Sequence, residues 1–485
     1  MTKDISTDIA IIGAGTAGLY ALREVRRARR DFVLIDHGPL GTTCARVGCM
    51  PSKIALHAGG LWAARDEMRR FGVAGTEDLT LDRSRTWAAL RSQRDHFADS
   101  AAGKARSAAG ERLIDGRARF VEPTVLEVEG ADDRTLVRAK ALIIATGSRP
   151  VRPAWLDALG DRVVTTDTFF ELPDLPERIG ILGLGAIGLE MGLALARLGV
   201  TVSGADVAST VAGLNDPELS ARAIERFGRE MDLWLGAPAS VTADDDALRL
   251  RSGEREARVD LLLAALGRRP NVDGLGLAEA GFALDARGTP LYDPATLQMG
   301  SHPVFIAGDA NAQRPLMHEA ADEGAIAGYN AARDDIVRFR RRVPLAIAFT
   351  DPDVCAVGAH SDELDPAHIV IGSASGDANG RSRILGGEAS LLRLYADRAD
   401  GRLRGAAMVA TGGEHLAHLL AWAIQRGETV HALLEMPFYH PVIEEMLQSA
   451  LQDAARQIGR DSPLPSGLRS AHDALAPAPD TEPSR

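Results

Sequence analysis

Residues 9–36 read IAIIGAGTAGLYALREVRRARRDFVLID, and residues 179–206 read IGILGLGAIGLEMGLALARLGVTVSGAD. Each stretch passes from an apolar run into Gly-x-Gly-x-x-Gly, then into a helical pattern and a second apolar run that ends in aspartate. The aspartate follows the first glycine at the same separation in both copies. Two copies with one spacing are far more specific than a lone glycine fingerprint, so the chain is predicted to hold two dinucleotide-binding units.

The three glycines of each copy have separate physical roles. The first allows a tight turn out of the strand, the second removes a Cβ where a pyrophosphate approaches, and the third lets the helix pack closely. The phosphates would rest on backbone N–H groups at the helix N-terminus. We therefore expect dinucleotide contacts at Gly13, Gly15, Gly18 and Asp36, and again at Gly183, Gly185, Gly188 and Asp206.

The aspartate at the end of each unit is expected to hydrogen-bond the ribose hydroxyls. A carboxylate at Asp206 would repel a 2′-phosphate, and no Arg or Lys follows it until Arg222. The second unit is therefore predicted to bind NAD rather than NADP. A tight strand-to-helix turn without a ligand is the alternative for Gly183 to Gly188.

Composition restricts the class of protein. The 485 residues are enough for about three domains. The formal net charge of -12 gives no basic surface for nucleic acid, and no apolar run is long enough to span a membrane. With only three cysteines and no signal-peptide pattern after Met1, the chain is expected to be soluble and cytoplasmic.

Outside the repeat, apolar strands end at Thr146-Gly147, at Gly267 and at Gly308-Asp309, and ligands of open α/β sheets collect at such ends. From about residue 345 the pattern changes. Strand-like runs at 345–349, 369–371, 391–395 and 405–409 precede helical patterns at 415–425 and 441–457, which indicates an α+β domain. Residues 461–485 are rich in Pro, Ser and Asp without sustained periodicity, which predicts a disordered tail.

Two cysteines lie close together in Gly41-Thr-Thr-Cys44-Ala-Arg-Val-Gly48-Cys49-Met-Pro-Ser-Lys53. A zinc site is one alternative, but it needs two more ligands, and Cys355 is distant while His37 or His57 would have to help. Two buried unpaired thiols are another. A redox pair requires a distorted segment, because positions i and i+5 of a regular helix are roughly 8.6 Å apart and a disulfide tolerates less than about 7 Å. Gly48 permits such a distortion.

These motifs together resemble the pyridine nucleotide–disulfide oxidoreductases, and within them the dihydrolipoamide dehydrogenase group. The resemblance covers nearly all of residues 5–458, in order. It rests on both glycine loops and on Cys44 to Lys53, Ala145-Thr-Gly147, Gly267-Arg-Arg-Pro-Asn271, Ala307-Gly308-Asp309-Ala, His318 with Glu323-Gly324, Phe349-Thr-Asp-Pro352 and His440-Pro-Val-Ile-Glu-Glu445.

The chain departs from the family around the cysteines. The family usually has two glycines before its Thr-Cys and Leu-Asn after the first cysteine, where this chain has Gly41-Thr42 and Ala45-Arg46. These differences leave room for a divergent substrate, such as another small disulfide. The glutathione-reductase group commonly has Lys at the position of Ser52, so Pro-Ser-Lys points away from that group.

The resemblance implies a role for each matched residue. Cys44 would be the thiol that meets substrate and Cys49 the thiol beside the flavin, with Lys53 near the flavin and paired with Glu190. His440 and Glu445 would form the general base, contributed by the other subunit of a homodimer, with Glu444 the alternative acid. His318, Arg46 and Cys355 are expected to be structural. FAD contacts are implied at Gly13, Gly15, Gly18, Asp36, Thr43, Lys53, Thr146, Gly147, Gly308 and Asp309, and NAD contacts at Gly183, Gly185, Gly188, Asp206 and Gly267.

The expected fold class is α/β, with two Rossmann-like dinucleotide-binding domains and a C-terminal α+β dimerisation domain. The expected divisions are an FAD-binding domain at 1–150, an NAD-binding domain at 151–273, a central domain completing the FAD site at 274–344, an interface domain at 345–460 and the tail at 461–485.

The implied activity is oxidation of dihydrolipoyl groups by NAD+ through a Cys44–Cys49 disulfide and FAD, with no metal. The partner would be free dihydrolipoamide or the lipoyl domain of a 2-oxo acid dehydrogenase-type complex. Two alternatives stay open. One is an NAD(P)H-dependent reductase of another small disulfide or a metal ion, although no cysteine follows Cys355 to form the extra C-terminal thiol pair of mercuric reductases. The other is a non-catalytic redox-sensing flavoprotein.

Overall fold

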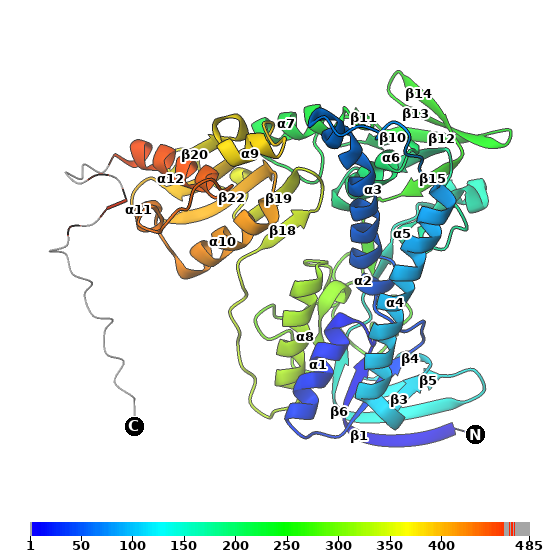
Figure 1. The fold of residues 1–485 in the computed structure, drawn as a ribbon. Helices are drawn as coiled ribbons and strands as arrows, with labels where there is room; N and C mark the ends of the chain where they lie inside the picture. The colour runs from blue at the N-terminus through cyan, green and yellow to red at the C-terminus, as the bar shows by residue number, and fades with distance from the viewer. Residues whose placement is uncertain (1, 460–464, 466, 469, 471–485) are drawn as a thin grey trace. The chain divides into compact units, whose positions relative to one another are not determined.

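The computed structural model describes residues 2–459, 465, 467, 468 and 470 (Figure 1). The chain forms two compact units, the first made of Met1–Val207 and Ala237–Arg341, the second of Ala208–Gly236 and Arg342–Arg485. The predicted divisions at 150, 273, 344 and 460 stay predictions. Most of the expected tail at 461–485 lies outside the described residues.

The first unit is built around a seven-stranded sheet with strand order β3-β2-β1-β6-β5-β4 and with β17 paired to β6. Strands β2, β1, β6 and β17 are parallel, whereas β4, β5 and β6 form an antiparallel extension. The strands are β1 (Thr2–Ile12), β2 (Phe32–Asp36), β3 (Leu113–Asp115), β4 (Arg117–Glu122), β5 (Val125–Glu129), β6 (Arg134–Ile144) and β17 (Val304–Ile306).

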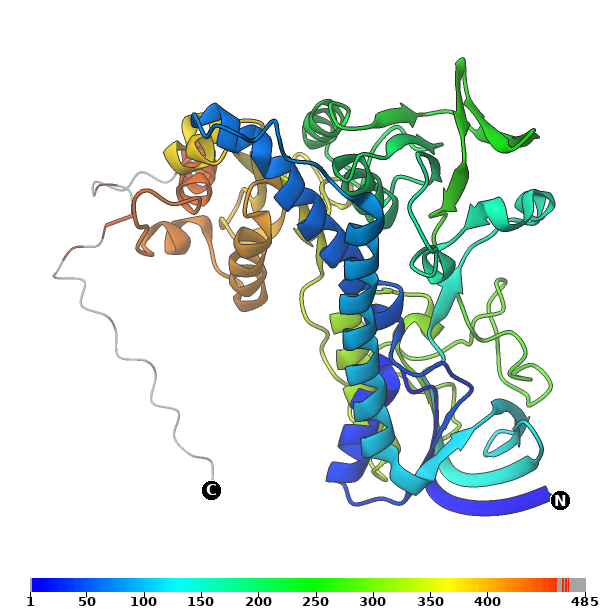
Figure 2. The same ribbon diagram turned by 45° about the vertical axis from the view of Figure 1, so that its right-hand side comes forward.

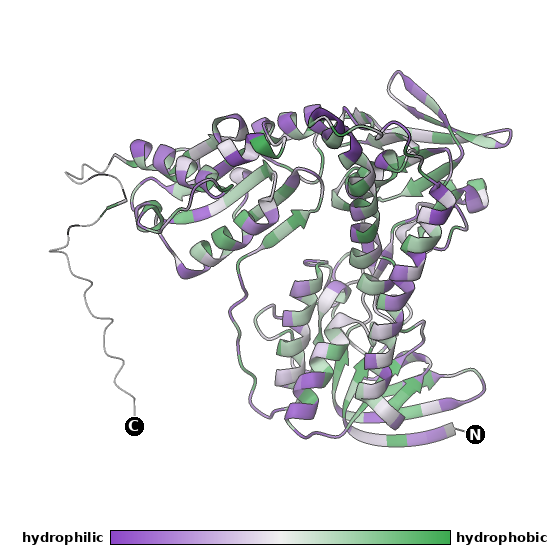
Figure 3. Ribbon diagram, in the orientation of Figure 1, coloured by the Kyte–Doolittle hydropathy of each residue, from purple (hydrophilic) through white to green (hydrophobic). Residues whose placement is uncertain are grey.

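Alternate residues of these strands enter two separate cores. Ile9 and Ile11 pack on one face with α1 (Thr16–Arg27) and α8 (Met317–Ala331), while Ala10 and Ile12 pack on the other. A parallel strand covered on both faces must be apolar throughout, which explains the continuous apolar run before the first glycine loop. Figure 3 shows this hydrophobic character along the strands of the sheet.

Helices α1 and α8 lie side by side in both ribbon views (Figures 1 and 2). A Cβ on Gly324 would lie 2.1 Å from Ala17 O, and one on Gly328 would lie 2.4 Å from Ala21 O. The two helices therefore approach backbone to backbone, which only glycine allows at these positions. This contact gives Gly324 of the Glu323-Gly324 motif a packing role.

Two long helices carry the segment that follows the cysteines. The helices are α2 (Thr43–Arg46), α3 (Cys49–Arg70) and α4 (Arg83–Ala109), followed by η1 (Gly110–Arg112). Helix α3 packs against α4 and against α6 (Ala186–Arg197), so it connects the first glycine-loop unit to the second.

The second glycine loop belongs to another sheet, in which β10 (Thr201–Asp206), β9 (Arg178–Leu182), β15 (Leu261–Ala264) and β8 (Val163–Val164) are neighbours in that order. All three of these pairings are parallel. Strands β7 (Ser148–Pro150) and β16 (Arg268–Pro270) pair as a short antiparallel ribbon, each at a point where the chain passes from one sheet to the other. The remaining helices of the unit are η2 (Ala154–Arg162), α5 (Thr166–Phe169) and η3 (Gly308–Asn311).

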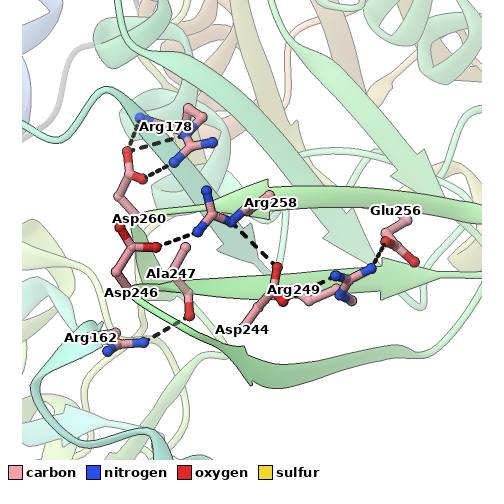
Figure 4. Close-up of polar contacts among 9 residues, drawn as sticks. All are labelled: Arg162, Arg178, Asp244, Asp246, Ala247, Arg249, Glu256, Arg258 and Asp260. Carbon is pink, nitrogen blue, oxygen red and sulfur yellow. Dashed lines mark hydrogen bonds and ion pairs between the residues drawn. The ribbon is translucent and has the colours of Figure 1, made fainter.

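An antiparallel meander projects from this second sheet, formed by β12 (Ala239–Asp244), β13 (Ala247–Ser252) and β14 (Arg255–Val259). Exposed ion pairs join its strands (Figure 4): Arg258 contacts Asp244 and Asp246, and Arg249 contacts Glu256 at 2.5 Å. Exposed pairs contribute little individually, so we assign this network a role in keeping the strands in register rather than in chemistry.

The second unit contains a five-stranded antiparallel sheet of order β18-β19-β22-β21-β20. Helices α10 and α12 cover it and share its core, in which Met408 and Leu420 are fully buried. The elements are α7 (Pro217–Phe227), β11 (Asp232–Leu235), β18 (Leu345–Ala348), β19 (Asp353–Gly358), η4 (Ser361–Glu363), β20 (Ile369–Ser375), η5 (Gly376–Ala378), α9 (Gly380–Ile384), β21 (Leu391–Asp397), β22 (Leu403–Ala410), α10 (Gly413–Arg426), α11 (Val430–Leu434) and α12 (Glu445–Ile458).

The expected α/β class and C-terminal α+β domain are confirmed. In the part of the chain that the structure describes, no helix has the length and apolar character needed to cross a bilayer.

Candidate active site

The first glycine loop has the geometry of a phosphate cradle. A Cβ on Gly13 would lie 2.3 Å from Ala145 O and one on Gly18 would lie 1.9 Å from Gly13 O, whereas a Cβ on Gly15 would meet nothing within 4 Å. The first and third glycines are therefore required by the fold, while the second faces open space at the N-terminus of α1. That space fits a dinucleotide pyrophosphate.

The second loop repeats this geometry. A Cβ on Gly183 would lie 2.5 Å from Ala265 O and one on Gly188 would lie 1.9 Å from Gly183 O, and Gly185 again faces open space. The internal repeat is thus a structural repeat, with one open position in each copy.

The terminal aspartates of the two units also match. Asp36 accepts a hydrogen bond from Ala14 N at 2.6 Å, and Asp206 accepts one from Leu184 N at the same distance. Each carboxylate therefore holds the turn of its glycine loop. Its position at the end of the second strand of the unit is the one expected for a ribose ligand.

Thr146 and Asp309 lie at the ends of β6 and β17, where a ligand of this sheet is expected. The hydroxyl oxygen of Thr146 is buried without a hydrogen-bond partner, an arrangement that a bound polar ligand would satisfy. Asp309 accepts a hydrogen bond from Ser148 Oγ at 2.6 Å, and Ser148 Oγ in turn accepts one from Arg268 Nε at 2.8 Å. These contacts fix the Asp309 carboxylate.

The two cysteines lie on separate helices. Cys44 belongs to α2, which ends at Arg46, and Cys49 is the first residue of α3. The expected distortion is present at Val47 and Gly48, where the backbone leaves helical angles. A Cβ on Gly48 would lie 3.2 Å from Thr43 O, so a larger residue would crowd the break.

Both cysteines are half-buried free thiols in hydrogen-bond contact with each other. The hydrogen bond from Cys44 lowers the pKa of Cys49 to about 7, with a further contribution from the nearby Lys53 cation, against the opposing effect of burial. The same hydrogen bond and burial raise the pKa of Cys44. The pair is therefore asymmetric: Cys49 loses its proton at lower pH than Cys44.

Thr42 occupies the position where the family usually has glycine. Its φ of 58° lies in the left-handed region, which is unusual for a β-branched residue. Its hydroxyl accepts a hydrogen bond from Ala45 N at 3.2 Å and so caps α2. This helix cap offsets part of the backbone strain.

Lys53 and Glu190 form the expected ion pair, with Lys53 Nζ 2.7 Å from Glu190 Oε2 and 2.9 Å from Oε1. The Glu190 side chain is 4 % exposed and that of Lys53 is 33 % exposed. The buried carboxylate thus has its countercharge on the helix that begins at Cys49.

His440 and Glu445 lie together in the second unit. His440 Nδ1 is 2.9 Å from Glu445 Oε1, and Glu445 Oε2 accepts a hydrogen bond from Val442 N. The His440 bond is the main cause of the lowered pKa of Glu445. The ring is oriented while 78 % of its side chain stays exposed, so its Nε2 is available for proton transfer.

Sequence reasoning assigned no role to Arg94, Ser148 and Arg268. Arg94 is 4 % exposed, pairs with Glu171 and donates to Arg46 O at the end of α2. Ser148 and Arg268 directly follow the motifs Thr146-Gly147 and Gly267, and this adjacency could have identified them as site residues. Arg94 had none, because its contacts are distant in sequence. Among the described residues, no group of three or more His, Cys, Asp or Glu side chains could hold a metal ion.

Comparison with known proteins extends this picture. The model of the pyridine nucleotide-disulphide oxidoreductase family matches residues 7–324, and the model of its dimerisation domain matches residues 344–451. The chain is 26 % identical over 472 residues to dihydrolipoyl dehydrogenase 3 of Haloarcula marismortui, covering 93 % of this chain and 96 % of that protein. It is 32 % identical over 472 residues to a mercuric reductase of Streptomyces lividans, covering 94 % and 96 %.

Among solved structures, the flavoprotein disulfide reductase RclA of Escherichia coli, a Cu(II) complex, aligns with a TM-score of 0.81 at 21 % identity, covering 92 % of this chain and 99 % of that one. This similarity supports the fold. Members of the family use FAD and a pyridine nucleotide, and both glycine loops fit such ligands. The dimerisation domain supports a homodimer. The chain belongs to the pyridine nucleotide–disulphide oxidoreductase family and is an oxidoreductase that acts on sulfur groups.

Proposed function

We propose that this protein oxidises dihydrolipoyl dithiols and passes the two electrons to NAD+ by way of FAD and the Cys44–Cys49 pair. The observation that carries the proposal is the dithiol at a helix break: Cys44 and Cys49 flank the break, and Cys49 begins the helix whose Lys53 pairs with Glu190 after the second glycine loop. The Lys53 cation also lowers the pKa of Cys49. A dithiol on a helix that packs against the helix of the second glycine loop is suited to exchanging electrons with bound dinucleotides.

The reaction balances as a dithiol plus NAD+ giving a disulfide, NADH and a proton. His440 Nε2 takes a proton from the substrate, and Glu445 holds the ring through Nδ1. The substrate thiolate attacks Cys44 Sγ of the oxidised pair, and Cys49 leaves as a thiolate favoured by the Lys53 charge. The second substrate thiol then attacks the mixed disulfide, releasing the oxidised substrate and the Cys44 thiol.

FAD would be held by the first glycine loop, Thr43, Lys53, Thr146, Gly147, Gly308 and Asp309, and it would supply two-electron chemistry between the dithiol and the nicotinamide. In this proposal the imidazole of His440 serves the dithiol of the other subunit of the dimer, which is supported by its exposure and by the dimerisation domain.

NAD is proposed over NADP because of Asp206, with Gly183, Gly185, Gly188 and Gly267 completing the site. Asp206→Asn keeps an oxygen to accept the hydrogen bond from Leu184 N while removing the negative charge. We expect the ratio of kcat/KM for NADPH to that for NADH to rise about tenfold, about 1.4 kcal/mol. A wild-type preference for NADPH would contradict the assignment.

The proposed partner is dihydrolipoamide or the lipoyl domain of a 2-oxo acid dehydrogenase-type complex, in the cytoplasm. A reductase of another small disulfide is the second candidate. It is favoured by Thr42, Ala45 and Arg46 around the cysteines, where the chain departs from the usual family pattern. The non-catalytic redox-sensing alternative is disfavoured because a binding role needs no oriented His440–Glu445 pair.

Steady-state rates decide between the two enzymatic candidates. The purified homodimer is assayed with dihydrolipoamide and NAD+, and in the other direction with NADH and a panel of disulfides that includes lipoamide. A kcat/KM for lipoyl compounds at least tenfold above the rest of the panel supports the proposal. A higher value for another disulfide favours the second candidate, and no turnover with any pair favours the redox sensor.

A further inference from the structure

The loop from Gly308 to Leu316, which contains Asp309, is held at both ends by two acids of α8. Glu323 Oε2 accepts hydrogen bonds from Gly308 N and from Asn311 Nδ2, each at 2.7 Å. Glu319 Oε1 accepts one from Arg314 Nη1 at 3.2 Å, near the other end of the loop. Hydrogen bonds to two carboxylates one helical turn apart therefore fix both ends of the loop.

These two carboxylates are buried, since the side chains of Glu319 and Glu323 are 3 % and 1 % exposed. Like charges at positions i and i+4 of a helix repel each other, and the repulsion grows when both are removed from water. Burial raises the pKa of Glu323 even though hydrogen bonds to Arg341 and Gly308 lower it. Such a pair needs a countercharge shared between its members.

Arg341 supplies that countercharge. Its Nη1 donates to Glu323 Oε1 at 2.6 Å, its Nη2 donates to Glu319 Oε2, and its side chain is 18 % exposed. The planar guanidinium can face two carboxylates at once, which a lysine ammonium cannot do with the same geometry. Arg341 is also the last residue of the first unit, where the chain leaves for the second.

We propose that Arg341 is a positioning residue for the flavin: by bridging Glu319 and Glu323 it fixes the loop that presents Asp309 to the bound FAD. The hydrogen bonds that Arg341 donates go to Glu319 and Glu323, not to the first glycine loop. It acts through the two acids, the Gly308 amide and the Asn311 side chain. The inference rests on the proposed function for the identity of the ligand at Asp309.

A purely structural ion pair would stabilise the apoprotein and the holoprotein equally, whereas a positioning residue changes the affinity for FAD. The test therefore measures two quantities on the full-length protein and its variants. One is the Kd of FAD, from quenching of flavin fluorescence on titration into apoprotein. The other is the urea midpoint of the apoprotein.

Arg341→Met removes the charge and keeps much of the side-chain length. We expect its Kd for FAD to rise at least tenfold relative to wild type. Arg338→Met is the matched control, because Arg338 lies in the same connecting segment and pairs with Asp293 at the surface, with 69 % of its side chain exposed. Its Kd should stay within twofold of wild type.

A second substitution tests the mechanism by which Arg341 acts. Glu319→Gln removes one of the two like charges and keeps an oxygen for Arg314, so Arg341→Met with Glu319→Gln should recover at least threefold of the lost affinity. Arg341→Lys should fall between wild type and Arg341→Met, and it carries the test if Arg341→Met does not fold.

Unchanged FAD affinity in Arg341→Met or Arg341→Lys, with a lowered urea midpoint, would overturn the inference and leave only a structural pair. Equal loss of affinity in Arg338→Met would also overturn it. Failure of the wild-type apoprotein to bind FAD at all would instead reject the proposed function, and the two failures are distinguished by this first measurement.

Discussion

Lys53 Nζ lies 2.7 Å from Glu190 Oε2, and this ion pair joins the helix that begins at Cys49 to the helix that follows the second glycine loop. Glu190 is almost fully buried, and the Lys53 cation against its carboxylate compensates its charge. The Lys53 ammonium, which lowers the pKa of Cys49, is thus held by an acid from the helix of the second glycine-loop unit. The ion pair links two parts of the chain that are 137 residues apart.

Glu190→Gln tests this link. The neutral side chain should lower stability by about 2 kcal/mol, because a charge-assisted hydrogen bond is lost and Lys53 keeps partial access to water. The charge of Glu190 raises the pKa of Cys49, so its removal should lower that pKa further. Urea unfolding measures the first effect, and the pH dependence of thiol alkylation in the reduced protein measures the second. An upward shift of the alkylation midpoint would contradict the electrostatic account.

The titration of Cys49 is a second prediction. Its thiolate fraction should rise with pH through a midpoint near 7, since the pKa is lowered from the ordinary thiol value. Cys44→Ala removes the hydrogen-bond donor and should move the midpoint upward, toward about 8.5, whereas Cys44→Ser keeps a hydroxyl donor and should move it less. Iodoacetamide alkylation followed by peptide mass spectrometry locates the reacting thiol. Equal midpoints in Cys44→Ala and wild type would show that Cys44 does not lower the pKa of Cys49.

Gly185→Ala and Gly188→Ala form a matched pair. A Cβ on Gly185 meets nothing, so the variant should fold normally, keep FAD and raise the KM for NAD+ about tenfold or more because the methyl group occupies the phosphate position. A Cβ on Gly188 would lie 1.9 Å from Gly183 O, so that variant should be destabilised by about 3 kcal/mol or more as an overpacked site. Thermal unfolding and initial rates separate the two. A normal KM in a folded Gly185→Ala protein would place the nucleotide elsewhere.

Glu445→Gln tests the orientation of His440. Loss of the carboxylate that holds Nδ1 should reduce dithiol turnover about 10²-fold, and His440→Asn about 10³-fold, within the range for general acid–base catalysis. Oxidation of NADH by an artificial one-electron acceptor needs no such base and should continue. Glu444→Gln is the control, because its carboxylate is not the one bonded to His440. If Glu444→Gln were the slower variant, the acid would have been assigned to the wrong position.

Local chemistry explains why several features were predictable. A glycine required by a clash at 1.9 Å with its own loop, as at Gly18, depends only on neighbouring backbone and is therefore readable from spacing. The break between Cys44 and Cys49 follows in the same way from helix geometry and from Gly48. The main cause of the lowered pKa of Cys49 is the Cys44 hydrogen bond, a contact that spacing alone does not reveal.

Elements whose stability comes from distant partners were harder to predict. Strand β19 was not among the expected strands and begins at Asp353, a half-buried carboxylate, yet pairing with β18 and β22 makes it an interior strand of the sheet. The last helix was expected from Pro441 but begins at Glu445, because the Glu445 side chain accepts the hydrogen bond from Val442 N and closes a turn there. Both differences reflect contacts that no local pattern records.

Spacing along the chain was sufficient to identify two dinucleotide cradles and a dithiol, since each is built from residues within one turn or one strand–helix unit and obeys local sterics. The polar contacts around these sites depend instead on tertiary packing. Glu190 meets Lys53, Ser148 meets Asp309, and Arg341 bridges two acids of α8 only after segments 18 to 161 residues apart have packed together. A buried charge takes whichever countercharge the fold brings within hydrogen-bond reach, and that choice is made in three dimensions.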